Sequence, residues 1–320
     1  MNVLSLFDGI SCARVALDVA DISVNKYYAC EIDKNAIKVS KKNYPDVISL
    51  GSVLDFKKDM IKEPIDLLIG GSPCQDLSIA KKDRKGLEGE RSSLFYEYVR
   101  IKNEIKPKYF ILENVASMKK EDKDIISGLM GVEPIMFNAS LVSAQTRKRY
   151  FWTNIQFELP EDRGILLKDI LQPDAEVDER MVNKDGKSYV LTSTYSKISN
   201  SEAQVKNSVE KKQRTMVKVG HIGNVDAQAH RVYSIEGKTP TLTCGSPLIK
   251  VGKDNVVVNL SPQTRVSDKE TIIRKLTPIE CERLQSLPDN YTEGIAMTQR
   301  YKCLGNAFNV EVVAHILKHI

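Results

Sequence analysis

The sequence is poor in the residues that bind metals and form cross-links. Four histidines occur in 320 residues, and no two of the six cysteines form a Cys-x-x-Cys pair. Structural zinc sites and disulfide scaffolds depend on such patterns. We therefore expect no metal site, and we interpret the cysteines as reduced thiols.

Long apolar runs are also lacking. No stretch approaches the length of a membrane span, and the N-terminus has no basic region followed by an apolar signal core. These absences predict a cytoplasmic protein without a membrane partner. The formal net charge of +5 is compatible with a polyanionic partner, but it does not indicate one by itself.

The first half of the chain alternates short apolar runs with amphipathic stretches. Strands are predicted near residues 2–7, 26–31, 46–50, 66–69 and 109–112, with helices between them. This alternation is typical of an α/β fold with a parallel sheet. Ligands of such sheets bind beyond the carboxyl ends of the strands, so the residues that follow each strand are the candidates for function.

A glycine turn follows the first predicted strand. Gly9 allows close approach of the backbone, and the next helix offers free N–H groups to a polar ligand. Glu31 ends the second strand about twenty residues later, which suits a ribose hydroxyl pair. The alternative for Glu31 is a carboxylate stabilised by the dipole of the helix that follows.

The fourth predicted strand ends in Gly70, Gly71 and Pro73, and Cys74 follows the proline. A thiol on a stiff turn at a strand end is a candidate nucleophile, although a free cysteine is often only a buried apolar residue. Glu113 ends the fifth strand on the same side of the sheet, where an acid and a thiol can share one substrate. The alternatives for Glu113 are a helix cap or an ion pair.

Two arginines and a change of composition mark the second half. Arg147 and Arg149 alternate along an extended segment, so they share one face, and arginine forks suit phosphate or a base carbonyl. A solvated basic run is the alternative.

The polar stretch 172–276 predicts a small, mostly β domain. A capping box at Thr277 then opens a helix, with further helices at 296–303 and 309–319 and a turn at Gly305-Asn306.

These signals form an ordered set that resembles the cytosine-5 DNA methyltransferase family. The resemblance rests on Phe7-Asp8-Gly9, Gly71-Ser72-Pro73-Cys74-Gln75, Glu113-Asn114-Val115, Gln145-Thr146-Arg147-Lys148-Arg149, the helix from Thr277 and Gly305-Asn306. It extends over nearly the whole chain except residues 173–275. The first half looks like the eukaryotic de novo enzymes, and the short total length looks bacterial or phage-like.

The resemblance implies an α/β fold with a large, Rossmann-like domain that binds S-adenosyl-L-methionine (AdoMet). Residues 1–171 and 277–320 would form this domain, and residues 172–276 a small, mostly β target-recognition domain. AdoMet would be converted to S-adenosyl-L-homocysteine (AdoHcy). Family members often carry an acid where this chain has Ser52, so adenine contacts are expected from Val53 or the backbone. The implied cofactor-binding residues are Phe7, Asp8, Gly9, Ile10, Glu31, Ile32, Ser52, Val53, Pro73, Asn306 and Ala307.

The implied chemistry begins with addition of the Cys74 thiolate to carbon 6 of a cytosine that has been flipped out of the duplex. Glu113 would manage a proton at ring nitrogen 3, Arg149 would hold the base carbonyl, and Arg147 would steady the site. The segment 79–90 would close over the base, or it is a plain solvated loop. Further substrate contacts are implied for Gln75, Ser78, Asn114, Thr241 and Leu242.

The expected partner is double-stranded DNA. The enzyme is expected to be a monomer in the cytoplasm of a bacterial or phage-infected cell. A cognate restriction endonuclease is a possible second partner. One alternative is a tRNA cytosine-5 methyltransferase, but the Cys-Phe-Thr tripeptide associated with that branch is absent. The other is a non-catalytic partner that only binds DNA. Such relatives usually lose the catalytic residues, whereas Cys74, Glu113, Arg147 and Arg149 are all present.

Overall fold

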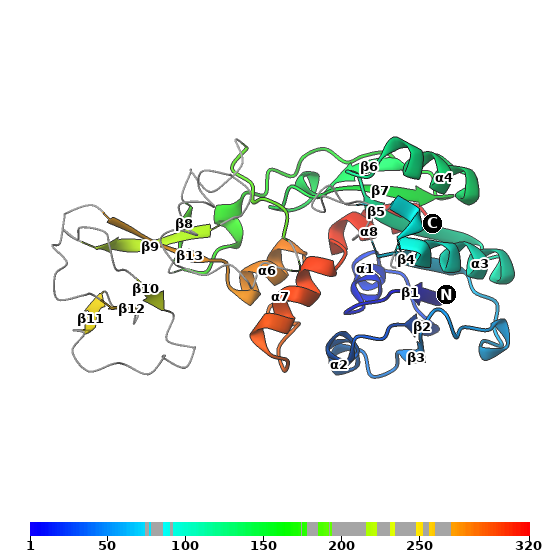
Figure 1. Cartoon of the computed structure of the whole chain (residues 1–320), viewed down its shortest axis with the longest axis horizontal. Helices are drawn as coiled ribbons and strands as arrows, with labels where there is room; N and C mark the ends of the chain where they lie inside the picture. Colours follow the sequence, from blue (N-terminus) through cyan, green and yellow to red (C-terminus); the bar gives the residue numbers. More distant parts are fainter. Residues whose placement is uncertain are drawn as a thin grey trace.

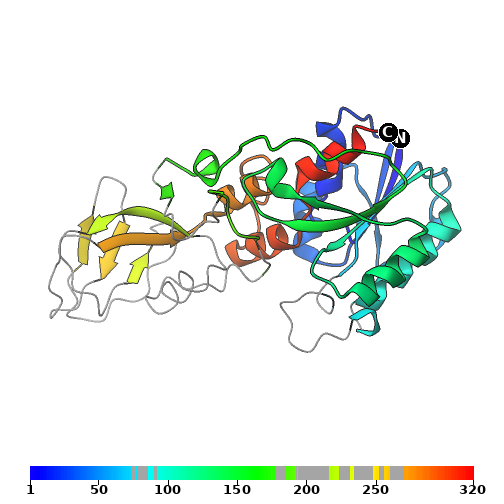
Figure 2. The same ribbon diagram turned by 90° about the horizontal axis from the view of Figure 1, so that it is seen from above.

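A computed structural model of the chain (Figure 1) describes residues 1–73, 77, 86–89, 92–173, 175–177, 185–191, 193, 216–222, 231–233, 248–251, 256–259 and 270–320. A large α/β body lies at one end, and two small sheets lie beyond helices α6 and α7 at the other (Figures 1 and 2). No helix in these ranges is long and apolar enough to cross a membrane.

The large body contains seven strands and the helices that cover them. In chain order they are β1 (Asn2–Leu6), α1 (Cys12–Val19), β2 (Lys26–Cys30), α2 (Lys34–Asn43), β3 (Ile48–Gly51), β4 (Leu67–Gly71), α3 (Phe95–Ile105), β5 (Tyr109–Val115), α4 (Lys120–Met130), β6 (Ile135–Asn138), β7 (Lys148–Thr153), α6 (Pro278–Leu284), α7 (Met297–Asn306) and α8 (Val310–Leu317).

The sheet has the strand order β3-β2-β1-β4-β5-β7-β6. The pairs from β3 to β5 are all parallel, which confirms the predicted α/β fold. Strand β7 runs antiparallel to both of its neighbours. The parallel strands therefore direct their carboxyl ends, and the residues that follow them, to one edge of the sheet.

Both faces of the sheet are buried, which explains why its strands read as continuous apolar runs. Successive side chains of a strand alternate between faces. Val3 of β1 belongs to one core with α1, α2 and α8, whereas Leu4 and Leu6 belong to the other with α3 and α4. The helices thus sandwich the sheet and fix the position of its loops.

Two details of the predicted elements are corrected. Helix α7 continues through Asn306, so the turn predicted at Gly305-Asn306 is wrong, and those residues form the last turn of the helix. Strand β6 was not predicted, because four residues with a single fully buried side chain give no clear periodicity. The predicted capping box is confirmed: the Thr277 hydroxyl accepts from the N–H of Glu280, and the Glu280 carboxylate accepts from the N–H of Thr277.

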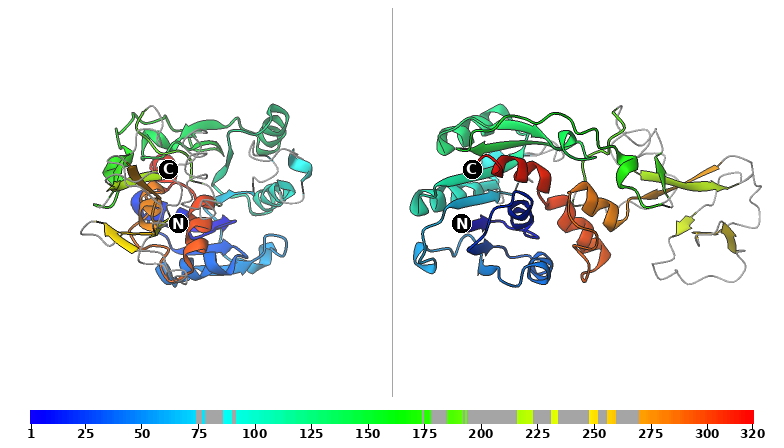
Figure 3. Two further views of the ribbon diagram at one scale, coloured as in Figure 1. Left: turned by 60° about the vertical axis from the view of Figure 1, so that its left-hand side comes forward. Right: turned by 180° about the vertical axis from the view of Figure 1, so that it is seen from behind.

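The stretch predicted as a small β domain contains two three-stranded sheets with the orders β13-β9-β8 and β10-β12-β11. Their strands are β8 (Glu176–Val177), β9 (Met216–Ile222), β10 (Arg231–Tyr233), β11 (Leu248–Val251), β12 (Val256–Asn259) and β13 (Glu270–Lys275). Figure 3 shows them set apart from the large sheet, with the C-terminal helices between.

The two ends of this stretch are held together. The N–H of Gln172 donates to the Glu280 carboxylate at 3.0 Å, and the Thr277 hydroxyl donates to the Gln172 side chain at 2.6 Å. Arg283 also donates to the carbonyl of Ile170 at 3.0 Å. We call the five residues that make these contacts the root clasp: Ile170, Gln172, Thr277, Glu280 and Arg283.

One part of the stretch 172–276 packs on the large body. Lys187 is buried there, and its ammonium donates to the carbonyls of Ser140 and Ile165 and to the Asp162 carboxylate. Leu191 lies in the core of the face covered by α1 and α8. Residues in the range 185–191 thus contact the large body before the chain enters β9.

Candidate active site

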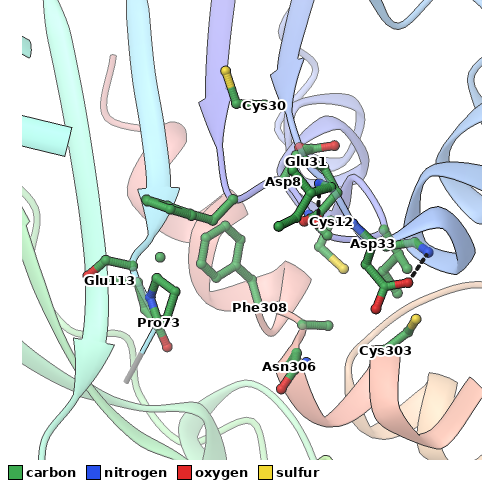
Figure 4. Close-up of a pocket in the computed structure, with 18 of the residues that line it drawn as sticks. Asp8, Cys12, Cys30, Glu31, Asp33, Pro73, Glu113, Cys303, Asn306 and Phe308 are labelled. Carbon is green, nitrogen blue, oxygen red and sulfur yellow. Dashed lines mark hydrogen bonds between the residues drawn. The ribbon is translucent and has the colours of Figure 1, made fainter. Parts of the chain in front are cut away.

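A cavity of about 320 Å³ opens at the edge where the parallel strands end. Its size is that of a small-molecule site. It extends from the turn after β1 to the ends of β4 and β5, and the end of α7 closes one side (Figure 4). All eleven of the predicted cofactor-binding residues line it: Phe7, Asp8, Gly9, Ile10, Glu31, Ile32, Ser52, Val53, Pro73, Asn306 and Ala307.

The turn between β1 and α1 has an unusual backbone. Phe7, Gly9 and Ser11 all have positive φ, at 56°, 62° and 60°. Such a conformation is free for glycine but strained for phenylalanine and serine, and strained residues cluster at functional sites. The turn is held from below by Asp8, whose carboxylate accepts from the hydroxyls of Ser11 at 2.5 Å and Tyr27 at 2.6 Å. Burial raises the pKa of Asp8, although these hydrogen bonds oppose the shift.

The Glu31 carboxylate is fixed by three backbone N–H groups. One oxygen accepts from Gly9 at 2.8 Å, and the other accepts from Ile32 and Asp33 at 2.7 Å each. These bonds leave acceptor capacity on the oxygen that faces Gly9. The carboxylate therefore stands at the cavity wall in one orientation, ready to accept from hydroxyl groups of a ligand.

The rim beside Glu31 is apolar and exposed. Ile32 is 73% exposed and Leu54 is 63% exposed, although both are large aliphatic residues that border the cavity. A flat, mostly apolar group that bound between them would remove this surface from water. Ser52 does not face the rim freely, because its hydroxyl accepts from the N–H of Leu54 at 3.1 Å.

An ion pair that the sequence analysis did not identify also borders the cavity. The Lys302 ammonium lies 2.6 Å from the Asp33 carboxylate and joins α7 to the start of α2. Partial burial would raise the pKa of Asp33, but hydrogen bonds from Lys302 and from the N–H groups of Asn35 and Ala36 outweigh it and lower that pKa. The two residues are far apart in the sequence, and no sequence pattern indicated that they pair.

At the other end of the cavity, Glu113 and Arg149 form an ion pair. The Nε atom of Arg149 lies 2.7 Å from Oε1 of Glu113, and both side chains are largely buried. Glu113 stands at the end of β5 beside Gly71 of β4, and the register pairs Val115 with Arg149. Figure 4 shows Glu113 next to Pro73, the last described residue before Cys74.

Arg147 lies at the same end but has a different environment. It is 5% exposed, and its guanidinium donates to the carbonyl of Ala307 at 2.9 Å, with longer bonds to Leu191 and Gly305. These contacts fix the end of α7 against the strand layer. Arg147 thus holds the wall formed by residues 305–307, whereas Arg149 holds a carboxylate.

Asn114 is buried and does not line the cavity. Its amide donates to the hydroxyl of Ser72 at 3.0 Å and to the Ser72 carbonyl at 3.4 Å, and its oxygen accepts from the N–H of Val115. The structure thus places Asn114 behind the turn that leads to Cys74. The sequence analysis had placed it in contact with substrate.

Five predicted residues lie outside the described residues: Cys74, Gln75, Ser78, Thr241 and Leu242, together with most of the segment 79–90. Three other cysteines line the cavity, namely Cys12, Cys30 and Cys303. Burial raises the pKa of Cys30 and of Cys303 to about 12, and it also raises the pKa of Cys12. The raised pKa disfavours the thiolate, which is the nucleophilic form, in all three.

Comparison with known proteins places the geometry in a family context. The family of C-5 cytosine-specific DNA methylases matches the chain over residues 1–320. The type II methyltransferase M.HhaI of Haemophilus parahaemolyticus is 28% identical, over 100% of this chain and 94% of its own length. The orphan methyltransferase M.SPRI of Bacillus phage SPR is 25% identical, over 100% of this chain and 97% of its own length.

Solved structures show the same fold. The methyltransferase EhMeth of Entamoeba histolytica superposes with a TM-score of 0.64 at 16% identity, over 100% of this chain and 97% of that protein. The Dnmt2 methyltransferase of S. pombe gives a TM-score of 0.60 at 15% identity, over 99% and 97% of the two chains. At these identities the likeness establishes the architecture alone.

Proposed function

The chain belongs to the C-5 cytosine-specific DNA methylase family and methylates cytosine in DNA, and from this premise we propose which of its residues perform the transfer. The observation that carries the proposal is the placement of Glu31 and the Glu113–Arg149 pair at opposite ends of one cavity. One end suits a nucleoside cofactor, and the other suits a pyrimidine ring. Pro73, beside Glu113, leads directly into Cys74.

AdoMet fits the first end by the chemistry of the groups there. The Glu31 carboxylate suits the ribose hydroxyls, and the exposed side chains of Ile32 and Leu54 suit the faces of an adenine. Val53 and Asn306 complete the lining of this cavity. When bound, AdoMet supplies a methyl group attached to a positively charged sulfur.

The acceptor end suits cytosine because it offers one acid and one arginine fork. In the free protein Arg149 and Glu113 satisfy each other. A flipped cytosine presents two acceptors, its carbonyl oxygen and ring nitrogen 3. Arg149 can then donate to the carbonyl, while Glu113 shares a proton with the nitrogen and offsets the charge that develops in the ring.

Cys74 is the proposed nucleophile. Its thiolate forms a bond to carbon 6 of the ring, which makes carbon 5 nucleophilic; loss of the carbon 5 proton later restores the double bond and expels the thiolate. The raised pKa values of Cys30 and Cys303 argue against the cavity thiols in this role. Arg147 and Asn114 act as positioning residues in this scheme, since they hold the backbones of the cofactor wall and of the Ser72 turn.

We further propose that residues 172–184 and 192–276 read the DNA sequence, that the enzyme works as a monomer on double-stranded DNA, and that it acts in the cytoplasm. The two small sheets support this division, since they stand apart from the large sheet (Figure 1). Its relatives include type II methyltransferases, which fits a cognate restriction endonuclease as partner.

The test is covalent trapping followed by mapping. Wild-type protein with AdoMet and DNA containing 5-fluorocytosine is expected to give a stable covalent adduct. In this base carbon 5 carries fluorine instead of hydrogen, so there is no proton to remove and the thiolate is not expelled. Cys74→Ala should give none, whereas Cys303→Ala, the matched control, should still give it. Bisulfite sequencing of unmethylated plasmid then identifies the modified cytosines. Methylation of tRNA without methylation of DNA would contradict the proposed substrate.

A further inference from the structure

Phe308 extends across the cavity between its two ends. Its backbone lies within hydrogen-bonding reach of the Cys12 thiol, beside the turn after β1. Its ring reaches the end of β4: a Cβ atom placed on Gly71 would lie 2.8 Å from Cε1 of Phe308 and 2.9 Å from Oε2 of Glu113. Figure 4 shows the ring between Glu31 and Asp8 on one side and Glu113 and Pro73 on the other.

This place corresponds to one chemical group of the cofactor. In AdoMet the charged sulfur stands between the ribose and the methyl group that is transferred. If the ribose is at Glu31 and the acceptor base is at Glu113, as the proposed function requires, the sulfonium must lie between them. Phe308 is the labelled side chain that Figure 4 shows there.

The surroundings explain why an aromatic ring is suited to this group. A sulfonium carries a positive charge but makes no conventional hydrogen bond, so a carboxylate gains less from it than from an N–H donor. The carboxylates in the described lining already have partners: Asp8 with Ser11 and Tyr27, Glu31 with three N–H groups, Asp33 with Lys302, and Glu113 with Arg149. The negative face of a ring attracts a cation without needing a donor.

We propose that the ring of Phe308 recognises the sulfonium of AdoMet by a cation–π contact, and that this contact makes the enzyme prefer AdoMet to AdoHcy. The inference rests on the proposed function, since it assumes that the cavity binds AdoMet. AdoHcy has the same adenosine and amino acid groups, but its sulfur is neutral. A ring face at this point therefore distinguishes the substrate from the product and favours release of AdoHcy after transfer.

The test is direct binding, measured by isothermal titration calorimetry without DNA. We compare the ratio of the AdoHcy and AdoMet dissociation constants in wild type, Phe308→Leu and Phe308→Tyr. Leucine keeps an apolar side chain but removes the π face, so the ratio is expected to fall about 2- to 30-fold. Tyrosine keeps the face and should leave the ratio near the wild-type value.

Two controls keep the result specific. Phe7→Leu removes the second ring among the described residues of the lining and should weaken both ligands alike. Pentafluorophenylalanine at position 308 keeps the ring shape but reverses its charge distribution, so it should reproduce the loss of preference even where Phe308→Leu does not fold.

Three outcomes would overturn the assignment. Equal weakening of both ligands in Phe308→Leu would make the ring a simple wall. Loss of preference in Phe7→Leu, with none in Phe308→Leu, would move the contact to Phe7. A wild-type protein that binds AdoMet without preference over AdoHcy would contradict sulfonium recognition, whereas a protein that binds neither would overturn the cofactor site itself.

Discussion

Arg149 and Glu113 face each other across two antiparallel strands, with 2.7 Å between Nε and Oε1 and little exposure of either side chain. A pair in such surroundings is sensitive to loss of one partner, because the remaining charge is left in a poorly solvated place. Each residue therefore stabilises the charge of the other until the cytosine binds between them.

The first prediction concerns Arg149→Ala. Loss of a donor aimed at developing charge typically costs about 10²- to 10³-fold in rate, so single-turnover methyl transfer should fall by that order. DNA affinity should change by less than about tenfold, since contacts of other residues to the phosphate backbone supply most of that affinity. Lys148→Ala is the matched control, because Lys148 is exposed beside it. Equal losses of rate and DNA affinity in Arg149→Ala would make it a phosphate contact.

Asn114→Ala tests the role of a positioning residue. The substitution removes the bonds to Ser72, so the turn before Cys74 loses its support. We expect kcat to fall at least about tenfold, unchanged dissociation constants for AdoHcy and DNA, and a loss of about 1–3 kcal/mol in stability from the unpaired Ser72 groups. Ser72→Ala should have a milder effect, since the backbone carbonyl still accepts. A weaker DNA complex with normal kcat would instead assign Asn114 to substrate binding.

Gly70→Ala tests how closely the sheet packs beneath the site. A Cβ atom there would lie 2.7 Å from the carbonyl oxygen of Leu6 and 3.2 Å from its Cβ, and the β1 backbone cannot yield easily. The free energy of unfolding should fall by about 1–3 kcal/mol, which urea unfolding measures. Gly128→Ala is the contrasting variant, because the space around Gly128 in α4 is open and alanine favours helices. It should stabilise by about 0.5–1 kcal/mol; destabilisation there would contradict the described helix.

Lys302→Met tests the ion pair at the cavity rim through its pH dependence. Because the pKa of Asp33 is lowered in the folded state, the pair stabilises the protein above the unfolded-state pKa of about 3.9, and this contribution is lost as pH falls through the folded-state pKa. The variant should therefore be less stable than wild type at pH 7, and the difference should shrink below about pH 4. Lys318→Met, at an exposed position, should show no such trend. A difference that stays constant down to pH 2.5 would exclude this pair as its origin.

Exchange of the recognition segment is the last prediction. Replacing residues 173–275 with the corresponding segment of a relative should transfer that relative's sequence preference, because the strands of the two small sheets, β8 to β13, all lie within these residues. Bisulfite sequencing reads the outcome. A chimaera that methylates with the original preference would place recognition in the large body.

The parallel part of the sheet was predictable because its strands are buried on both faces and read as apolar runs. The capping box at Thr277 was predictable because it depends on residues three apart. The contacts of Arg147 and Asn114 were not, because their acceptors include backbone carbonyls, which every residue carries and no sequence pattern reveals. The antiparallel direction of β7 and the packing of residues 185–191 on the large body depend on contacts between distant segments. The local periodicity of the sequence therefore could not predict them.

The root clasp has a consequence for how such a protein can change over evolutionary time. Gln172 and Glu280 fix the entrance and the exit of the inserted stretch side by side, and residues 185–191 are the part between them that packs on the large body. The entropic cost of closing a loop grows only with the logarithm of its length. The remainder of the stretch can therefore lengthen, shorten or be replaced with little cost to the stability of the catalytic body, and the same body can acquire new target sequences without being rebuilt.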